Sequence, residues 1–345
     1  MKLSFHHLDL HLAHSWVIAR GRTDVAKVVV VELTDKDGII GRGEAAPISR
    51  YKESVRSVET FFTQIEPGHL SYDAIPESMA YLSGLASHEM AAKCAINIAL
   101  LDGAAKRARK PIHDSLGLAF RERHHLTSFS IGLGTPDAIR QKVLAARQYP
   151  VLKMKVGGQE DKAALAALRE AAPEKVVRVD ANEAWPTKEE ALHQIEWLAG
   201  DGHIQFVEQP LPASTPKKDW LWLKQRSPLP IFGDESHHSA KDTAHAAECF
   251  HGVNVKLVKS GGITGAFEAL SAARKVGLKT MLGCMIETSI LISAAAHLAE
   301  LCDYLDLDGN LLTTNDPYHG VTAENGILSF TKAQEKFGLR VSARG

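Results

Sequence analysis

The sequence predicts an α/β protein in which a small α+β capping domain precedes a modified TIM barrel of the (β/α)7β type. Two observations favour this fold. From about residue 126 onward, short apolar strands alternate with amphipathic helices, which is typical of parallel βαβ units. Eight strands in roughly 185 residues suit a barrel that lacks its last helix. A doubly wound dinucleotide-binding sheet would need a G-x-G-x-x-G turn, and the sequence has none.

The capping domain is expected to span residues 1–122. Two apolar runs, at 28–32 and 39–44, flank the turn-forming cluster D-K-D-G at 35–38. This arrangement predicts a β-hairpin. Alanine, isoleucine, leucine and methionine then recur at helical spacing over residues 88–109, which predicts a helix. The first part of the chain therefore has a different organisation from the rest.

The barrel is expected to span residues 123–312. Its strand candidates are LTSFSIG at 126–132, VLKMKVG at 151–157, VVRVDAN at 176–182, IQFVEQP at 204–210, PIFGDES at 230–236, VNVKLVK at 253–259, KTMLGCM at 279–285 and YLDLDGN at 304–310. The intervening helices are expected to begin at or near Pro136, Asp161, Thr187, Lys217, Ser239, Ile263 and Thr288. Residues 313–345 include a strand-like segment at 326–330 and are expected to return to the capping domain.

Composition limits the classes of function. Hydrophobic residues make up 45% of the chain and charged residues 23%, which is ordinary for a globular protein. The formal net charge of −1 favours neither a nucleic acid nor a membrane as partner. No apolar run approaches the length of about 18 residues that a membrane span needs. The start lacks the apolar core of a signal peptide, and the four cysteines form no C-x-x-C, so we expect reduced thiols and a cytoplasmic location.

Three carboxylates stand at the ends of consecutive strand candidates. Asp180, Glu208 and Asp234 are each separated by about one βα unit, and active sites of such barrels lie at the C-terminal ends of the strands. Close like charges raise one another's pKa, so the cluster predicts a bound cation. Oxygen ligands without Cys or His favour a hard ion such as Mg²⁺ over Zn²⁺. The alternative is three separate carboxylates that cap helices or pair with lysines.

Lysines flank this cluster. Lys153 and Lys155 are two residues apart on one strand and so share a face. Lys256 belongs to a strand four places away, on the opposite wall of an eight-stranded barrel, in a segment that also carries Lys259. A lysine beside a metal and another ammonium has a lowered pKa and can act as a general base. Two opposed lysines predict racemisation or epimerisation of a carbon between them. The alternative is that these lysines reach the surface as solvated side chains.

Together these motifs resemble those of the enolase superfamily, in its muconate-lactonizing subgroup. They are K-M-K at 153–155, V-D-A-N at 179–182, V-E-Q-P at 207–210, D-E-S at 234–236 and N-V-K-L-V-K-S-G-G at 254–262. The resemblance covers nearly the whole chain and implies an enolase-like fold. It implies that the three carboxylates bind one Mg²⁺ per subunit. It also implies that Lys155 and Lys256 form the acid/base pair and that Lys153 stabilises the enolate oxygen.

The strand-8 segment narrows the resemblance to dipeptide epimerases. D-L-D at 306–308 is similar to their D-x-D, whose acidic pair holds the substrate's N-terminal ammonium, and G-C-M-I-E-T at 283–288 is also similar. Arg22 resembles a loop arginine that binds the side-chain carboxylate in L-Ala-D/L-Glu epimerases, with Arg20 as the alternative. The substrate-binding residues implied by the resemblance are Arg22, Ser130, Lys153, Met285, Asp306 and Asp308.

The activity implied is that of a Mg²⁺-dependent isomerase that inverts the α-carbon of the C-terminal residue of a dipeptide. L-Ala-D/L-Glu is the expected substrate, which would point to cell-wall peptide metabolism. Alternatives in the subgroup are epimerases of hydrophobic or cationic dipeptides, muconate cycloisomerases, o-succinylbenzoate synthases and N-acylamino acid racemases. A Schiff-base aldolase and a non-catalytic dipeptide-binding barrel are alternatives from other classes. The expected partner is a small-molecule dipeptide, and a homo-oligomer is left open.

Two further expectations concern residues around these groups. Asn182 and Glu235 are expected to orient the metal ligands and lysines. Loops near Arg22 and Tyr51 are expected to close the barrel mouth and select the substrate side chain.

Overall fold

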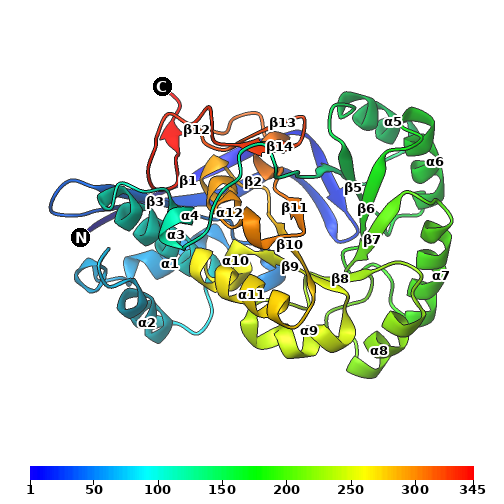
Figure 1. Cartoon of the computed structure of the whole chain (residues 1–345), viewed down its shortest axis with the longest axis horizontal. Helices are drawn as coiled ribbons and strands as arrows, with labels where there is room; N and C mark the ends of the chain where they lie inside the picture. Colours follow the sequence, from blue (N-terminus) through cyan, green and yellow to red (C-terminus); the bar gives the residue numbers. More distant parts are fainter.

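The computed structural model describes residues 1–345 and contains an eight-stranded parallel sheet curled into a barrel (Figure 1). Its strands follow one another in sequence order as β4 (Phe129–Ile131), β5 (Val151–Lys155), β6 (Val176–Asp180), β7 (Ile204–Glu208), β8 (Ile231–Gly233), β9 (Gly252–Lys256), β10 (Lys279–Gly283) and β11 (Tyr304–Asp306). A parallel bridge between Thr127 and Leu305 links the first strand segment to the last and nearly closes the barrel. The predicted barrel is therefore confirmed.

Helices between the strands form the outer layer of the barrel (Figure 1). They are α5 (Pro136–Ala145), α6 (Asp161–Ala171), α7 (Lys188–Ala199), α8 (Lys217–Arg226), α9 (Thr243–Cys249), α11 (Ile263–Lys275) and α12 (Ser289–Ala296). Threonine side chains cap three of them, because Thr135, Thr187 and Thr288 each accept a hydrogen bond from the first-turn backbone. Three of the predicted helix starts, near Pro136, Thr187 and Thr288, thus lie at capping threonines.

The strand predicted at 253–259 is confirmed, but its end was placed too late. Strand β9 ends at Lys256, and the chain then forms the short helix α10 (Leu257–Ser260), so Lys259 lies on a helix and not on the strand. Gly261, with φ of 75°, ends this turn in the left-handed conformation that glycine adopts without steric cost. The apolar run L-V continued the strand pattern, and periodicity alone does not separate a short buried helix from a strand.

The N-terminal part contains a three-stranded antiparallel sheet of β1 (Lys2–Ile18), β2 (Gly21–Thr34) and β3 (Ile40–Ala45), followed by α1 (Val55–Thr63), α2 (Ile75–Leu85), α3 (Met90–Arg107) and α4 (Ile112–Ser115). The predicted hairpin is β2–β3, and the predicted helix is α3. Helix α3 packs closely on β3, since a Cβ on Gly43 would lie 1.9 Å from the carbonyl oxygen of Ala95. Only glycine allows this approach.

Strand β1 was absent from the sequence prediction. Its apolar residues, such as Leu8 and Leu10, alternate with exposed histidines and acids, as in a strand with one face in solvent. It pairs with β2 as far as Ile18–Gly21, and this long hairpin reaches the barrel mouth. The short 3-10 helix η1 (Ser49–Tyr51) approaches the same mouth.

The remaining short elements are η2 (Pro67–His69), η3 (Ala240–Asp242), η4 (Ala299–Leu301), η5 (Gly309–Leu312), β12 (Tyr318–His319), β13 (Thr322–Glu324), β14 (Ile327–Ser329) and β15 (Ser342–Ala343). The C-terminal segment touches both parts of the fold. The amide of Thr314 donates to the carbonyl of His11 in β1, and Ile327 forms an antiparallel bridge with Leu126 beside the barrel. The domain boundaries at residues 122 and 312 stay predictions.

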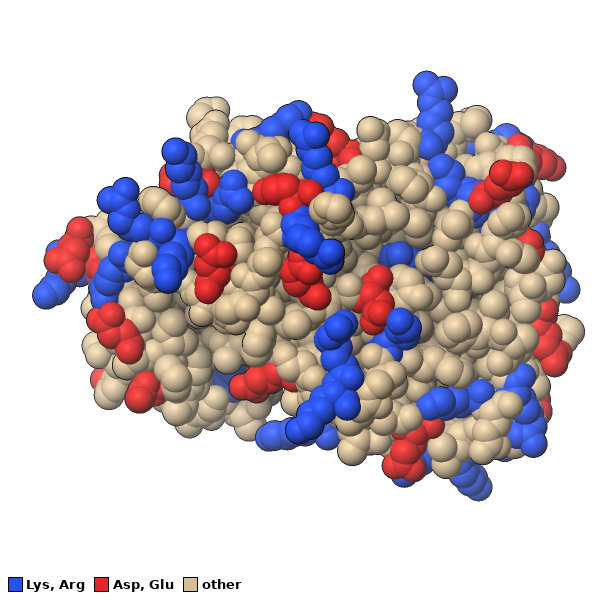
Figure 2. Space-filling view, viewed as in Figure 1, with Lys and Arg blue, Asp and Glu red and all other residues tan.

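Acidic and basic side chains are intermixed on the face shown in Figure 2. The four cysteines are all free. None of the helices has both the length and the apolar character that crossing a membrane requires.

A buried histidine pair joins helix α4 of the N-terminal part to the end of α12 in the barrel, and the C-terminal segment contacts this pair. The Nδ1 atoms of His113 and His297 lie 2.8 Å apart, and Nε2 of His297 lies 3.3 Å from the carbonyl oxygen of Leu339. Because a carbonyl only accepts, the hydrogen of His297 resides on Nε2, and its Nδ1 accepts from His113. Burial lowers the pKa of His297 to about 3.

We expect the free energy of unfolding to decrease as the pH falls from about 6.5 towards 3. The unfolded His297 takes up a proton in this range and the folded one does not, so acid favours the unfolded state. The expected loss from this residue at about pH 5 is on the order of 2 kcal/mol. Urea unfolding at about pH 7.5 and pH 5 measures it. His297→Gln should weaken the pH dependence, and the control His193→Gln, at an exposed position on α7, should not. Equal pH dependence in the two variants would contradict the prediction.

Candidate active site

The C-terminal ends of the barrel strands open into a cavity of about 690 Å³. The barrel contributes the floor and walls: Ser130, Lys153, Lys155, Asn182, Glu235, Lys256, Met285, Asp306 and Asp308. The β1–β2 hairpin and the segment 46–56 cover it from the N-terminal side, with Arg22 and Tyr51 among their lining residues. Every substrate-binding and lysine residue expected from the sequence therefore lines one cavity.

The three strand-end carboxylates lie beneath this cavity. Asp180, Glu208 and Asp234 are all buried. The parallel register places Lys155 of β5 beside Asp180 of β6, and Asp180 beside Glu208 of β7. Residues that are one βα unit apart in the sequence thus lie side by side on adjacent strands of the sheet. The carboxylates therefore converge, as expected.

Lys153 points into the middle of the acidic cluster. Its Nζ lies 3.1 Å from Oδ2 of Asp180, 2.7 Å from Oε2 of Glu208 and 2.7 Å from Oδ2 of Asp306. Burial lowers the pKa of Lys153, but these carboxylates outweigh burial and raise it well above its ordinary value. Lys153 is therefore held as an ammonium.

The other two lysines face each other across the barrel. Nζ of Lys155 lies 2.6 Å from Oδ2 of Asp180, and Nζ of Lys256 lies 2.8 Å from Oδ2 of Asp234. Strands β5 and β9 are four places apart in an eight-stranded barrel, so these amines come from opposite walls. Burial lowers the pKa of Lys256, but Asp234 outweighs it, so the pKa is raised.

The expected lowering of the lysine pKa values supposes a bound metal and a second ammonium next to the amines, and it stays a prediction. The structure instead places buried carboxylates within 3.1 Å of them. An opposite charge at that distance favours the charged form.

The carboxylates suit a hard divalent ion by their chemistry, but they are not arranged as a ready-made metal site. No group of three or more His, Cys, Asp or Glu side chains is placed to hold a metal ion. Each carboxylate faces a lysine instead. Oε2 of Glu208 is nevertheless buried without a hydrogen bond, since its contact with Lys153 has the distance but not the geometry of one. Burial and Asp180 raise the pKa of Glu208 to about 7, so the cluster can accept further positive charge.

Two residues that support the cluster were not assigned this role from the sequence. Nδ2 of Asn254 donates to Oε1 of Glu208 at 2.7 Å. Lys259 donates to the carboxylate and the carbonyl of Asp234, each at 2.5 Å, and also to two neighbouring carbonyls. The position of Asn254, two residues before Lys256 on the same strand face, was the available indication for the first. Lys259 is a supporting residue and lies outside the cavity.

The acidic pair of β11 is asymmetric. Asp306 accepts from Oγ of Ser128 at 2.7 Å and faces Lys153, which outweighs burial and lowers its pKa. Asp308 accepts from the amide of Ser130 at 2.6 Å. Burial and the charge of Asp306 raise the pKa of Asp308 to about 7. Asp306 thus has a cationic partner in the protein, and Asp308 faces the cavity without one of comparable strength.

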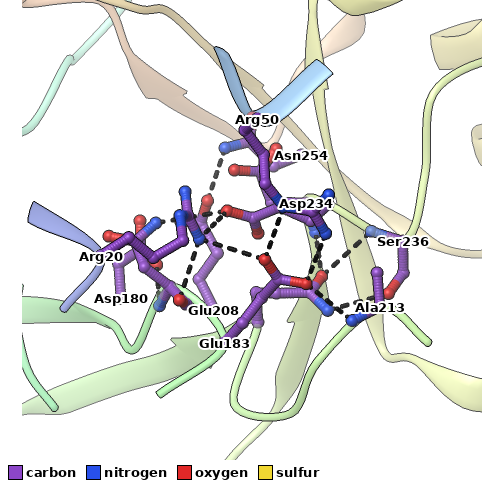
Figure 3. Close-up of polar contacts among 12 residues, drawn as sticks. Arg20, Arg50, Asp180, Glu183, Glu208, Ala213, Asp234, Ser236 and Asn254 are labelled. Atoms are coloured by element: carbon purple, nitrogen blue, oxygen red, sulfur yellow. Dashed lines mark hydrogen bonds and ion pairs between the residues drawn. The ribbon is translucent and has the colours of Figure 1, made fainter. Parts of the chain in front are cut away.

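The structure distinguishes the two loop arginines. Nη1 of Arg20 lies 2.7 Å from Oε1 of Glu235 and 2.9 Å from the carbonyl of Asn182, so Arg20 is bound to the barrel (Figure 3). The side chain of Arg22 is 64% exposed and contacts Asp24 at 3.2 Å. Arg22 is therefore the more exposed of the two arginines, and its partner lies on the same hairpin.

Comparison with known proteins agrees with this architecture. Residues 6–117 match the family described as "Mandelate racemase / muconate lactonizing enzyme, N-terminal domain", and residues 137–325 match "Enolase C-terminal domain-like". An "L-Ala-D/L-amino acid epimerase" of Pedosphaera parvula is 65% identical, with 100% of both chains covered. An "L-Ala-D/L-Glu epimerase" of Bacteroides thetaiotaomicron is 36% identical over 95% of this chain and 85% of its own.

Solved structures show the same relationship. A dipeptide epimerase from Enterococcus faecalis, complexed with Mg and L-Leu-L-Tyr, has a TM-score of 0.89 and 29% identity, and 99% of each chain is covered. A substrate-liganded L-Ala-D/L-Glu epimerase from Bacillus subtilis has a TM-score of 0.91 and 25% identity, with 100% of this chain and 99% of that chain covered. The chain therefore belongs to the mandelate racemase / muconate lactonizing enzyme family of the enolase superfamily and is an isomerase of the epimerase type.

Proposed function

We propose that this protein is a Mg²⁺-dependent dipeptide epimerase that inverts the α-carbon of the C-terminal residue, with L-Ala-D/L-Glu as substrate. The observation that carries the proposal is the placement of Lys155 and Lys256 on opposite walls of one cavity that also contains Asp306 and Asp308. Opposed amines suit inversion of a carbon, and a buried acidic pair suits a free α-ammonium. The epimerase names of the relatives support the same reaction.

Substrate binding divides between the barrel and the loops. The N-terminal ammonium of the dipeptide binds Asp308, whose ionised form a bound cation favours. Asp306 adds to this charge and also holds Lys153. Arg22 binds the side-chain carboxylate of a C-terminal glutamate, and Ser130 and Met285 contact the dipeptide from the cavity wall.

Asp180, Glu208 and Asp234 are the residues that would hold the metal. A divalent ion bound there would neutralise the charge that develops on the substrate carboxylate when the α-proton leaves. Lys153, as an ammonium, adds a second positive charge on the same side and stabilises the carboxylate oxygen of the substrate. Asn254 and Lys259 hold Glu208 and Asp234 in place by hydrogen bonds.

The proton transfer uses one lysine on each face of the α-carbon. The neutral amine of Lys155 removes the proton of the L isomer while the ammonium of Lys256 returns one to the other face. The reverse reaction exchanges these roles. Tyr51 and the β1–β2 hairpin cover the cavity and reduce the access of water to the reacting carbon.

A second candidate is an epimerase that accepts many C-terminal residues beside glutamate. Arg22 does not stand alone in the loop, since Asp24 lies 3.2 Å from it. Asp24 does not line the cavity, but it already pairs with the guanidinium of Arg22, so Arg22 is less available to a glutamate side chain. The relative with 65% identity is named for L-Ala-D/L-amino acids in general.

A dipeptide library in D₂O with Mg²⁺ tests the proposal and ranks the two candidates. Each turnover introduces one deuterium at the α-carbon, which mass spectrometry detects as a gain of about one mass unit. Fast exchange of L-Ala-L-Glu alone favours the narrow specificity, and exchange across many C-terminal residues favours the broad one. Exchange only in N-acylamino acids, or in no compound at all, would contradict dipeptide epimerisation.

We expect Asp308→Asn to lower kcat/KM for L-Ala-L-Glu about 100-fold, because the variant no longer offers a charged partner to the ammonium. Asp308→Asn is a sharper test than Asp306→Ala, since Asp306 also neutralises Lys153. Deuterium exchange at several substrate concentrations measures the change. The control Asp137→Asn, at an exposed acid of α5, should leave kcat/KM unchanged. Unaltered kinetics in Asp308→Asn would exclude this ammonium site.

A further inference from the structure

The side chain of Glu183 joins two N-terminal loops to the barrel (Figure 3). Its Oε1 accepts from Nη2 of Arg50 at 2.8 Å and from the amide of Ala213 at 2.7 Å. Its Oε2 accepts from Nε of Arg50 at 2.9 Å and from Nη1 of Arg20 at 3.3 Å. One carboxylate therefore receives donors from the β1–β2 hairpin, from η1 and from the loop after β7.

Arg20 extends this contact to a second acid. Its Nη1 also lies 2.7 Å from Oε1 of Glu235, which follows the strand-end carboxylate of β8. We call the set Arg20, Arg50, Glu183 and Glu235 the loop latch. It spans two loops from the N-terminal part of the chain and two strand ends of the barrel.

The backbone that carries Glu183 is held in an uncommon conformation. Asn182 and Glu183 have φ values of 46° and 67°, in the left-handed region that non-glycine residues rarely adopt. The amide of Glu183 donates to the carbonyl of Gln209, which itself has a φ of 38°. Such conformations cost about 1 kcal/mol or more each and persist where the surroundings enforce them. Here they direct the carboxylate of Glu183, whose side chain is 10% exposed, toward Arg50 and Arg20.

The loops that the latch holds are those that line the cavity on the substrate side. Residues 20–23 of the hairpin and residues 48–51 around η1 all border it. Tyr51, next to Arg50, also packs edge-on against His238 of the barrel with ring centroids 5.2 Å apart. The position of Arg22 and Tyr51 over the cavity therefore depends on where the two arginines beside them are anchored.

We propose that Glu183 is a positioning residue that, through Arg50 and Arg20, fixes both loops over the barrel mouth and so sets the affinity for the substrate side chain. This inference takes its substrate from the proposed function, whereas the contact between the loops and the barrel does not depend on that function. Arg50 and Glu183 form a bidentate pair, the geometry that gives arginine–carboxylate contacts their directional strength. The catalytic lysines, Lys155 and Lys256, contact neither partner, so weaker substrate binding without loss of chemistry is the expected result.

The test compares Glu183→Gln, Arg50→Met and the double variant with the unaltered protein. We expect each single variant to raise KM for L-Ala-L-Glu about tenfold with kcat changed less than about threefold. The double variant should be no worse than either single one, because the pair acts as a unit. Arg50→Lys should retain more affinity than Arg50→Met, since lysine keeps the positive charge but cannot bind the carboxylate through two N–H groups as a guanidinium does. The control Arg140→Met breaks an exposed ion pair on α5 and should change nothing.

A second measurement needs no substrate. Trypsin cleaves after arginine, so loosening the hairpin should speed cleavage after Arg20 and Arg22 at least about tenfold at unchanged Tm. Faster cleavage together with raised KM supports the latch. Unchanged cleavage in both single variants overturns it, and so does a joint loss of kcat and Tm without faster cleavage. If the unaltered protein fails to epimerise any dipeptide, the proposed function fails, and the cleavage rates still decide the latch.

Discussion

Lys155→Ala is expected to abolish epimerisation while hydrogen exchange continues at the α-carbon of one isomer. Inversion needs a base on one face of the carbon and an acid on the other, and Lys155 and Lys256 are the amines that lie on opposite walls. With Lys155 absent, Lys256 still removes and returns the proton on its own face. The expected loss of epimerisation is at least about 10³-fold.

The measurement follows deuterium and chirality together. In D₂O with Mg²⁺, the Lys155→Ala protein should exchange the α-hydrogen of the D isomer and leave that of the L isomer in place. Lys256→Ala should give the mirror result. Chiral chromatography of the recovered dipeptides should find no inverted product from either variant.

A matched control is available on α6. Lys162 is exposed and lies outside the cavity, so Lys162→Ala should epimerise at the unaltered rate. Lys155→Ala also removes a partner of Asp180, and a Tm measured beside the kinetics shows whether the fold persists. A folded Lys155→Ala protein that still inverts dipeptides at near the original rate would disprove the two-lysine reaction.

Removal of divalent ions is expected to have an effect of similar size. Chelation should lower the epimerisation rate at least about 10³-fold, and Mg²⁺ should restore it, because the substrate carboxylate otherwise bears the developing charge without a metal. The ammonium of Lys153 remains in the chelated protein, but it is shared among three carboxylates.

Calorimetric titration with Mg²⁺ separates metal binding from catalysis. Glu208→Gln should remove the binding heat, since an amide oxygen is a weaker ligand than a carboxylate. Glu170→Gln, at an exposed acid of α6, should titrate like the unaltered protein. Full activity in chelated protein shown by elemental analysis to hold no divalent metal would contradict the metal requirement.

The arrangement of the barrel could be predicted because its information is local. Each strand is a short apolar run, each helix has its own periodicity, and capping threonines such as Thr135 and Thr187 mark the helix starts. In a parallel barrel with successive neighbours, the ends of all strands meet at one mouth. Residues one βα unit apart, such as Asp180 and Glu208, therefore become neighbours without further information.

Other features required the tertiary structure because they depend on contacts between distant segments. Arg20 and Arg22 are equivalent in the sequence. Contacts with Asn182, 162 positions away, and with Glu183 and Glu235 bind Arg20 to the barrel, whereas Arg22 pairs with Asp24 of its own hairpin. The protonation of Lys153 depends on three carboxylates from three other strands. Strand order and the position of each carboxylate at a strand end were thus determined by the sequence. Which charges neutralise one another was decided by packing, since Coulomb interactions depend on distance in space and burial rather than on separation along the chain.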